Sequence, residues 1–133
     1  MRKVGSEAPA MRLQNASGGE QIVGMIHEKV QLLLLRADRA LLDACQRAVG
    51  EHPKVLLVAV ETATDTTQTI ALSDPDGLFS QRYGIDQGGV VIDKEGIIRA
   101  ITDRLDAPAL LIDAALLAAK PRRGHDHENW MRA

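Results

Sequence analysis

The sequence predicts an α/β fold of the sandwich type, in which a mixed sheet of four to five strands carries helices on both faces. Three observations lead to this prediction. Two short apolar runs flank an amphipathic segment, which is the pattern of two buried strands joined by a helix. A shorter helical segment and a β-hairpin pattern come next. A strongly apolar helical segment then closes the domain.

The first half of the chain begins with a polar segment and continues with a strand–helix–strand unit. Val4–Lys29 is rich in polar residues and in glycine and proline breakers, so we expect it to be mostly loop. Gln31–Leu35 and Lys54–Val60 are predicted to be the two buried strands. The helix between them is expected to run from Asp38, a suitable N-cap, to Gly50. The two strands should therefore be parallel, with a right-handed crossover.

The second half is expected to supply a short helix and a hairpin. A Thr-rich loop, Glu61–Thr69, precedes a short helix, Gly77–Tyr83, which Asp76 would cap. Val90–Asp93 and Ile97–Ile101 are predicted to pair as a β-hairpin around a glycine-containing turn.

The closing helix is expected to begin at Asp106 as its N-cap, to run through Ala119 and to stop before Pro121. The spacing of its apolar residues predicts one face that would pack on the sheet. That face is expected to contain Leu110, Leu111, Ala114, Leu117 and Ala118.

Length and composition limit the possible functions. The 133 residues suffice for one domain, which we place at 1–120, followed by a polar tail at 121–133. A net charge of −2 and only three aromatic residues argue against nucleic-acid binding, which uses basic surfaces and aromatic stacking. No apolar run approaches the roughly 20 residues that span a bilayer, and no secretory signal is evident. We therefore expect no membrane partner and a cytoplasmic location.

Three stretches resemble the peroxiredoxin branch of the thioredoxin superfamily, the alkyl hydroperoxide reductase/thiol-specific antioxidant family. They are V-G-S-E-A-P-A-M-R-L at Val4–Leu13, L-S-D-P-D-G-L-F-S-Q-R-Y-G-I at Leu72–Ile85, and V-V-I-D-K-E-G-I-I-R at Val90–Arg99. The predicted order of elements is also similar to that of a thioredoxin-like domain. The resemblance implies a thioredoxin-like sandwich on a peroxiredoxin-like scaffold.

The catalytic signatures of these families are absent. The resemblance places P-x-x-x-T/S-x-x-C directly after the first central strand, where this chain has Arg36, Ala40 and Asp43 at the positions of Pro, Thr/Ser and the peroxidatic Cys. When the segment is aligned with the C-x-x-C of thioredoxin instead, the two cysteine positions hold Arg39 and Leu42. The resemblance therefore implies the scaffold without its redox site.

The chain is also similar to the cysteine-free thioredoxin-like domain at the C-terminus of flavin-dependent aromatic-ring hydroxylases. The similar residues are G-S-E-A-P at Gly5–Pro9, L-L-R-A-D-R-A-L at Leu34–Leu41, Tyr83–Gly84, and V-I-D-K-E-G at Val91–Gly96. This resemblance implies an accessory and oligomerisation role without contact to the flavin. No G-x-G-x-x-G fingerprint occurs in the chain, and we expect no cofactor.

Cys45 is the only cysteine, and its place in the predicted helix bears on any thiol chemistry. It shares an apolar stripe with Leu41, Leu42, Ala48 and Val49. A cysteine on such a stripe is expected to be a buried core residue with a raised pKa, and it lies about two turns from the helix N-terminus that would stabilise a thiolate. The alternative is a displaced peroxidatic thiol whose pKa is lowered by Arg36, Arg39 or Arg47.

A candidate binding crevice lies beyond the carboxyl ends of the predicted strands, where α/β folds bind ligands. Arg36, Asp38 and Arg39 follow the first strand and could hold an anion or a carboxylate. Gly88 and Gly89 precede the hairpin, at the site where thioredoxins carry a cis-proline and peroxiredoxins often a threonine. The alternative interpretation of the three charged residues is an exposed loop with a helix cap.

The polar tail contains His125, His127 and Trp130. Two histidines among acidic residues invite a metal interpretation, but a metal site needs further ligands in an enforced geometry, so we predict none. The lone tryptophan could dock on the domain or on a partner.

These observations favour a redox-inactive module that acts in binding or oligomerisation, expected as a homodimer and with room for a protein partner. Three alternatives remain open. The first is an atypical one-cysteine thiol peroxidase or oxidoreductase that uses Cys45. The second is an accessory domain related to the hydroxylase C-terminal domain. The third is a small-ligand binder that uses the crevice at Arg36 and Arg39.

Overall fold

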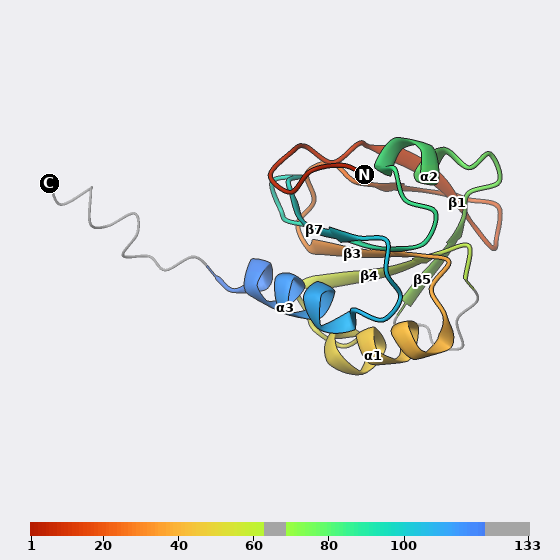
Figure 1. The fold of residues 1–133 in the computed structure, drawn as a ribbon. Coiled ribbons are helices and arrows are strands. Elements are labelled where there is room, and N and C mark those ends of the chain that lie inside the picture. The colour runs from red at the N-terminus through yellow and green to blue at the C-terminus, as the bar shows by residue number, and fades with distance from the viewer. Residues whose placement is uncertain (63–68, 122–133) are drawn as a thin grey trace, which may run out of the picture.

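A seven-stranded mixed sheet runs through the molecule, with helices packed on it (Figure 1). The computed structural model describes residues 1–62 and 69–121. The order of strands in the sheet is β2-β1-β5-β4-β3-β6-β7. The strands are β1 (Met11–Asn15), β2 (Glu20–Val23), β3 (Val30–Leu35), β4 (Val55–Val60), β5 (Thr69–Ser73), β6 (Gly88–Ile92) and β7 (Ile98–Thr102).

The strand–helix–strand unit at the centre of the sheet is confirmed. β3 and β4 pair in parallel from Val30–Val55 to Leu35–Val60, and the helix α1 (Arg39–Val49) connects them. β3 is buried at all of its positions because it lies inside the sheet and both of its faces are covered. The hairpin is confirmed as well, since β6 and β7 pair antiparallel and Gly96 in their turn has φ of +82°.

The sheet has seven strands where four or five were expected. β1 and β2 form an antiparallel hairpin within the segment predicted to be mostly loop, and β5 begins at Thr69, where the Thr-rich loop was expected to end. These three strands have only four or five residues each. Polar residues such as Arg12 and Gln14 in β1 and Glu20 in β2 interrupt the apolar ones, and β5 has only three apolar residues in a row, so each strand contributes too few apolar residues for a clear pattern.

Helices cover both faces of the sheet, as predicted. α1 and α3 (Pro108–Ala119) lie on one face, and α2 (Leu78–Tyr83) lies on the other (Figure 1). The core on the α2 side contains Phe79 and Tyr83, whose rings stack with centroids 4.5 Å apart. The core on the α1 and α3 side is aliphatic apart from Cys45. Each face of the sheet therefore has a hydrophobic core of its own.

The N-terminus of α1 is built as predicted. The carboxylate of Asp38 accepts a hydrogen bond from the backbone N–H of Leu41 at 2.8 Å, which satisfies one of the free donors of the first turn. The buried face of α1 contains Leu41, Leu42, Cys45 and Val49. Ala48 was expected on this face and is exposed instead.

The other two helices begin differently from the prediction. The N-cap residue of α2 is Gly77, and the buried carboxylate of Asp74, not that of Asp76, accepts from the N–H groups of Leu78 and Phe79. α3 begins at Pro108, and Asp106 forms an ion pair with Arg104 at 2.8 Å rather than capping the helix. Proline at the first helical position has no N–H group that needs an acceptor, which suits a helix start without a side-chain cap.

The buried face of α3 also differs from the prediction. Leu111, Ala115 and Ala119 are buried, whereas Leu110 is 50% exposed and Leu117 is 68% exposed. Asp113 is the only charged residue within the helix. Apolar periodicity therefore could not mark the outer face, and packing on the sheet selected the face with the smaller residues Ala115 and Ala119.

Candidate functional site

Arg36 lies at the carboxyl end of β3, where the resembled families carry their redox motif. Its backbone has φ of +47°, a left-handed conformation that is uncommon for residues other than glycine. The guanidinium donates from Nη1 to the hydroxyl of Ser80 at 3.3 Å and to the carbonyl oxygen of Asp86 at 2.9 Å. Arg36 therefore links the end of β3 to α2 and to the loop that follows it.

Asp38 and Arg39 lie on the other side of the sheet, at the start of α1. The Asp38 carboxylate is used as the helix cap, and Arg39 Nη1 lies 3.6 Å from the Asp43 carboxylate, one turn along the helix. Arg36 and Arg39 thus have separate protein partners on opposite faces of the sheet. Anion binding in the crevice between them stays a prediction.

Gly88 and Gly89 begin β6 next to the end of β3, where they pair with Leu35 and Leu34. A Cβ atom on Gly88 would overlap the carbonyl oxygen of Thr102, and one on Gly89 would press on the Leu111 side chain. The two glycines therefore allow β6 to approach β7 and α3 closely. No cis peptide bond occurs among residues 1–62 and 69–121.

Cys45 is completely buried in the core between α1 and the sheet. Desolvation by this burial raises the pKa of its thiol from 9.0 to about 11. Asp43, which the resemblance aligns with the peroxidatic cysteine, is partly exposed and pairs with Arg39. The prediction that Cys45 is a core residue is confirmed, and the nearby arginines do not lower its pKa.

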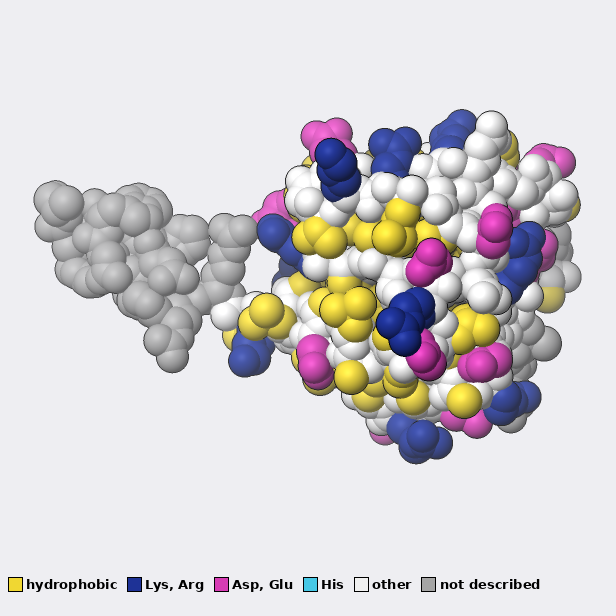
Figure 2. All heavy atoms as spheres, viewed as in Figure 1, with side chains coloured by type: hydrophobic (Ala, Val, Ile, Leu, Met, Phe, Trp, Pro, Cys, Tyr) yellow, Lys and Arg dark blue, Asp and Glu magenta, His cyan; other side chains and the backbone are white. Residues whose placement is uncertain are grey.

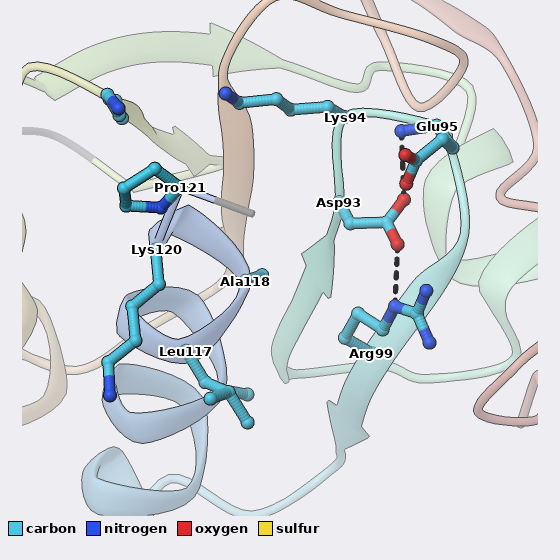
Figure 3. A pocket seen from close by; sticks show the side chains of 10 residues that line it. Asp93, Lys94, Glu95, Arg99, Leu117, Ala118, Lys120 and Pro121 are labelled. Atoms are coloured by element: carbon cyan, nitrogen blue, oxygen red, sulfur yellow. Dashed lines mark hydrogen bonds and ion pairs between the residues drawn. The ribbon is translucent and has the colours of Figure 1, made fainter. Parts of the chain in front are cut away.

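The apolar outer face of α3 is a feature that the sequence reasoning missed. Figure 2 shows apolar side chains on the viewed face over α3 and beside it. Leu117 on this helix lines a cavity of about 640 Å³ between the C-terminal half of α3 and the β6–β7 turn (Figure 3). The signal that could have found it is the near absence of polar residues in Pro108–Ala119.

The cavity beside α3 has a mixed lining. Its residues are Lys54, Asp93, Lys94, Glu95, Arg99, Ala114, Leu117, Ala118, Lys120 and Pro121. A second cavity of about 560 Å³ lies on the N-terminal segment and the loop after β2, where Met25 and Ile26 line it. Neither cavity contains a residue of the predicted crevice.

No group of three potential metal-ligating side chains is found within the described residues. His125, His127 and Trp130 lie outside them. In the part of the chain that the structure covers, no helix has the length and apolar character needed to cross a membrane.

No known protein-family profile matches the sequence, and neither does any curated protein. Solved structures do match. A peroxiredoxin-like protein from Aquifex aeolicus aligns with a TM-score of 0.67 and 17% identity over 87% of this chain and 88% of that one. A thiol peroxidase from Chromobacterium violaceum aligns with a TM-score of 0.66 and 12% identity over 90% of each chain.

A third similar structure is the pneumococcal exposed lipoprotein thioredoxin Etrx1 from Streptococcus pneumoniae. It aligns with a TM-score of 0.63 and 17% identity over 82% of this chain and 99% of that one. At these identities the similarity shows the fold alone. The predicted thioredoxin-like sandwich on a peroxiredoxin-like scaffold is therefore confirmed.

Proposed function

We propose that this thioredoxin-fold chain is a redox-inactive module that acts through binding or oligomerisation and catalyses no reaction itself. One observation carries the proposal: its sole cysteine, Cys45, is completely buried in α1. The positions at which the resembled families hold a reacting cysteine contain Arg39, Leu42 and Asp43.

Thiol chemistry at Cys45 would need both ionisation and access. The thiolate is the nucleophile, and with a pKa of about 11 only about one thiol in 10,000 is ionised at pH 7. The side chain has no exposed surface, so neither a peroxide nor a disulfide can reach the sulfur without local unfolding of α1. Both conditions disfavour the one-cysteine peroxidase alternative.

Exposed apolar side chains support a binding role. Leu110 and Leu117 on α3 are at least half exposed, and Ile26 in the loop after β2 is 72% exposed. Leu110 and Leu117 lie two turns apart on the same helix, and an exposed apolar patch is typical of an interaction site. A homodimer is the simplest assembly that would use such surface.

Thiol reactivity tests the redox part of the proposal. Native protein at pH 7.4 should react with DTNB only after unfolding in urea, and it should consume no hydrogen peroxide with dithiothreitol as the reductant. The matched control is Asp43→Cys in a Cys45→Ser background, which places a partly exposed thiol at the family position and should react in the native state. Peroxide consumption that Cys45→Ser abolishes would contradict the proposal.

Light scattering coupled to size exclusion tests the oligomerisation part. We expect a mass of twice 14.4 kDa at concentrations of about 100 μM. A monomer that persists at millimolar concentration would contradict the homodimer. The relationship to the hydroxylase C-terminal domain and the cytoplasmic location stay predictions.

A further inference from the structure

The cavity between α3 and the β6–β7 turn has two chemically different sides. Ala114, Leu117, Ala118 and Pro121 form an apolar wall along the C-terminal half of α3. In Figure 3 the charged residues Asp93, Lys94, Glu95 and Arg99 lie across from this wall, on the turn and on β7. The hairpin side of the cavity is therefore charged, and the helix side is apolar except for Lys120 at the end of α3.

The polar side is organised around the Asp93 carboxylate. Asp93 is only 5% exposed and accepts hydrogen bonds from the backbone N–H groups of Glu95 and Ile97, each at 3.0 Å. It also accepts from Arg99 Nε at 2.6 Å. This contact holds the Arg99 side chain against the hairpin, and the two terminal nitrogens of the guanidinium take no part in it (Figure 3).

Among the described lining residues, positive charges outnumber negative ones. Lys54, Lys94, Lys120 and Arg99 contribute four positive charges, and Asp93 and Glu95 contribute two negative ones. Arg99 and Asp93 compensate each other. Among residues 1–62 and 69–121, no acidic group pairs with any of the three lysine ammonium groups. Figure 3 shows Lys94 extending from the turn in the direction of Pro121.

We propose that this cavity binds a small amphipathic anion, a molecule with one carboxylate or similar group on an apolar chain or ring. The apolar part would lie along Leu117 and Ala118, and the anionic group would meet Lys94 of the turn and Lys54, which precedes β4. The volume of about 640 Å³ is within the range of small-molecule sites. This inference names a ligand class for the binding role proposed above.

Matched amphiphiles test the proposal with the full-length protein. Octanoate, 1-octanol and octylammonium share one apolar chain and differ in charge, and acetate has the charge without the chain. We expect saturable octanoate binding in a titration followed by amide NMR shifts, with the largest shifts at Leu117, Ala118 and Lys94. Octanoate should bind at least about fivefold more tightly than 1-octanol, and octylammonium and acetate should bind more weakly still.

Two variants separate the charge from the apolar wall. Lys94→Glu should weaken octanoate binding by about five- to tenfold and leave 1-octanol binding unchanged, because it replaces an attraction with a repulsion. Leu117→Asp should weaken the binding of both. Leu117 is 68% exposed, so this variant is expected to fold. The matched controls are Lys3→Glu, an exposed lysine outside the cavity, and Ile26→Asp in the second cavity, and both should bind octanoate as the wild type does.

Three results would overturn the proposal. One is the absence of saturable octanoate binding up to 20 mM, a limit of about 2–3 kcal/mol in affinity. Another is equal affinity for octanoate and 1-octanol. The third is loss of binding in Ile26→Asp but not in Leu117→Asp, which would move the site to the second cavity. None of these results changes the DTNB reactivity of Cys45, so failure of the ligand proposal is distinguishable from failure of the redox-inactive proposal.

Discussion

α1 and α3 pack side by side on the same face of the sheet, yet they are built on different principles. In α1 the polar and apolar residues lie on different faces. Arg39 and Arg47 are exposed, and Leu41, Leu42 and Cys45 are buried. α3 has apolar residues on its outer face as well as its inner one. An amphipathic helix on the surface of a domain packs its apolar face on the core and exposes its polar face to water, so it needs no further partner. A helix that is apolar on all sides normally has a further partner, and in α3 the outer face borders the cavity for which we propose a ligand.

The largest effect should come from the buried face of α3. Leu111→Ala is expected to lower the free energy of unfolding by about 3 kcal/mol, because it leaves a cavity under the helix against Gly89 and Leu34. Leu117→Ala removes the same atoms from the exposed face, and it should change the free energy of unfolding by less than about 0.5 kcal/mol. Urea unfolding measures both. Equal losses in the two variants would contradict the orientation of α3.

The buried thiol of α1 should make stability depend on pH. In the folded protein the pKa of Cys45 is about 11, above its ordinary value of 9.0. The contribution of this neutral thiol to the free energy of unfolding is therefore complete below pH 9 and is lost as pH rises toward 11. Between pH 8 and 10.5 this loss is about 2 kcal/mol, from about 1.5 pH units at 1.36 kcal/mol each.

Comparison with Cys45→Ala isolates this contribution in urea unfolding curves recorded across the same pH range. Burial also raises the pKa of Tyr83, so ionisation of this tyrosine lowers the free energy of unfolding at still higher pH. Because Tyr83 is present in both proteins, its effect cancels in the comparison. The difference in unfolding free energy between wild type and Cys45→Ala should therefore shrink above pH 9. A difference that stays constant to pH 10.5 would mean that the thiol is not buried.

The helix caps should give the smallest effect. Asp38→Ala is expected to lower the free energy of unfolding by about 1 kcal/mol, because the N–H of Leu41 loses its acceptor. Asp106→Ala near the start of α3 should leave it unchanged within experimental error, since Asp106 caps nothing and its pair with Arg104 is exposed. Thermal unfolding followed by circular dichroism distinguishes the two, and similar losses would mean that Asp106 caps α3 in solution.

Much of the fold could be predicted because its central elements carry strong local patterns. The continuous apolar runs of β3 and β4 need no context to be identified as buried strands, and Asp38 precedes α1 at the capping position. β1, β2 and β5 were missed because their few apolar residues stand among polar ones, and pairing with neighbouring strands stabilises them more than their own sequence does. The carboxylate at the start of α2 was misplaced by two residues because Asp74 and Asp76 are chemically equivalent, and only the backbone geometry selects Asp74.

The candidate site divides in the same way. That Cys45 lies on the inner stripe of a helix was determined by the sequence alone, since helical periodicity is a local property. The alignment of Asp43, Arg39 and Leu42 with the family cysteines is what the resemblance implies, and it stays a prediction. The face that α3 turns toward the sheet was decided only by the tertiary structure, because a helix with Asp113 as its sole charged residue has no polar stripe to orient it. The cavity is decided there as well, since it brings Lys54, Lys94 and Leu117 together from three separate parts of the chain.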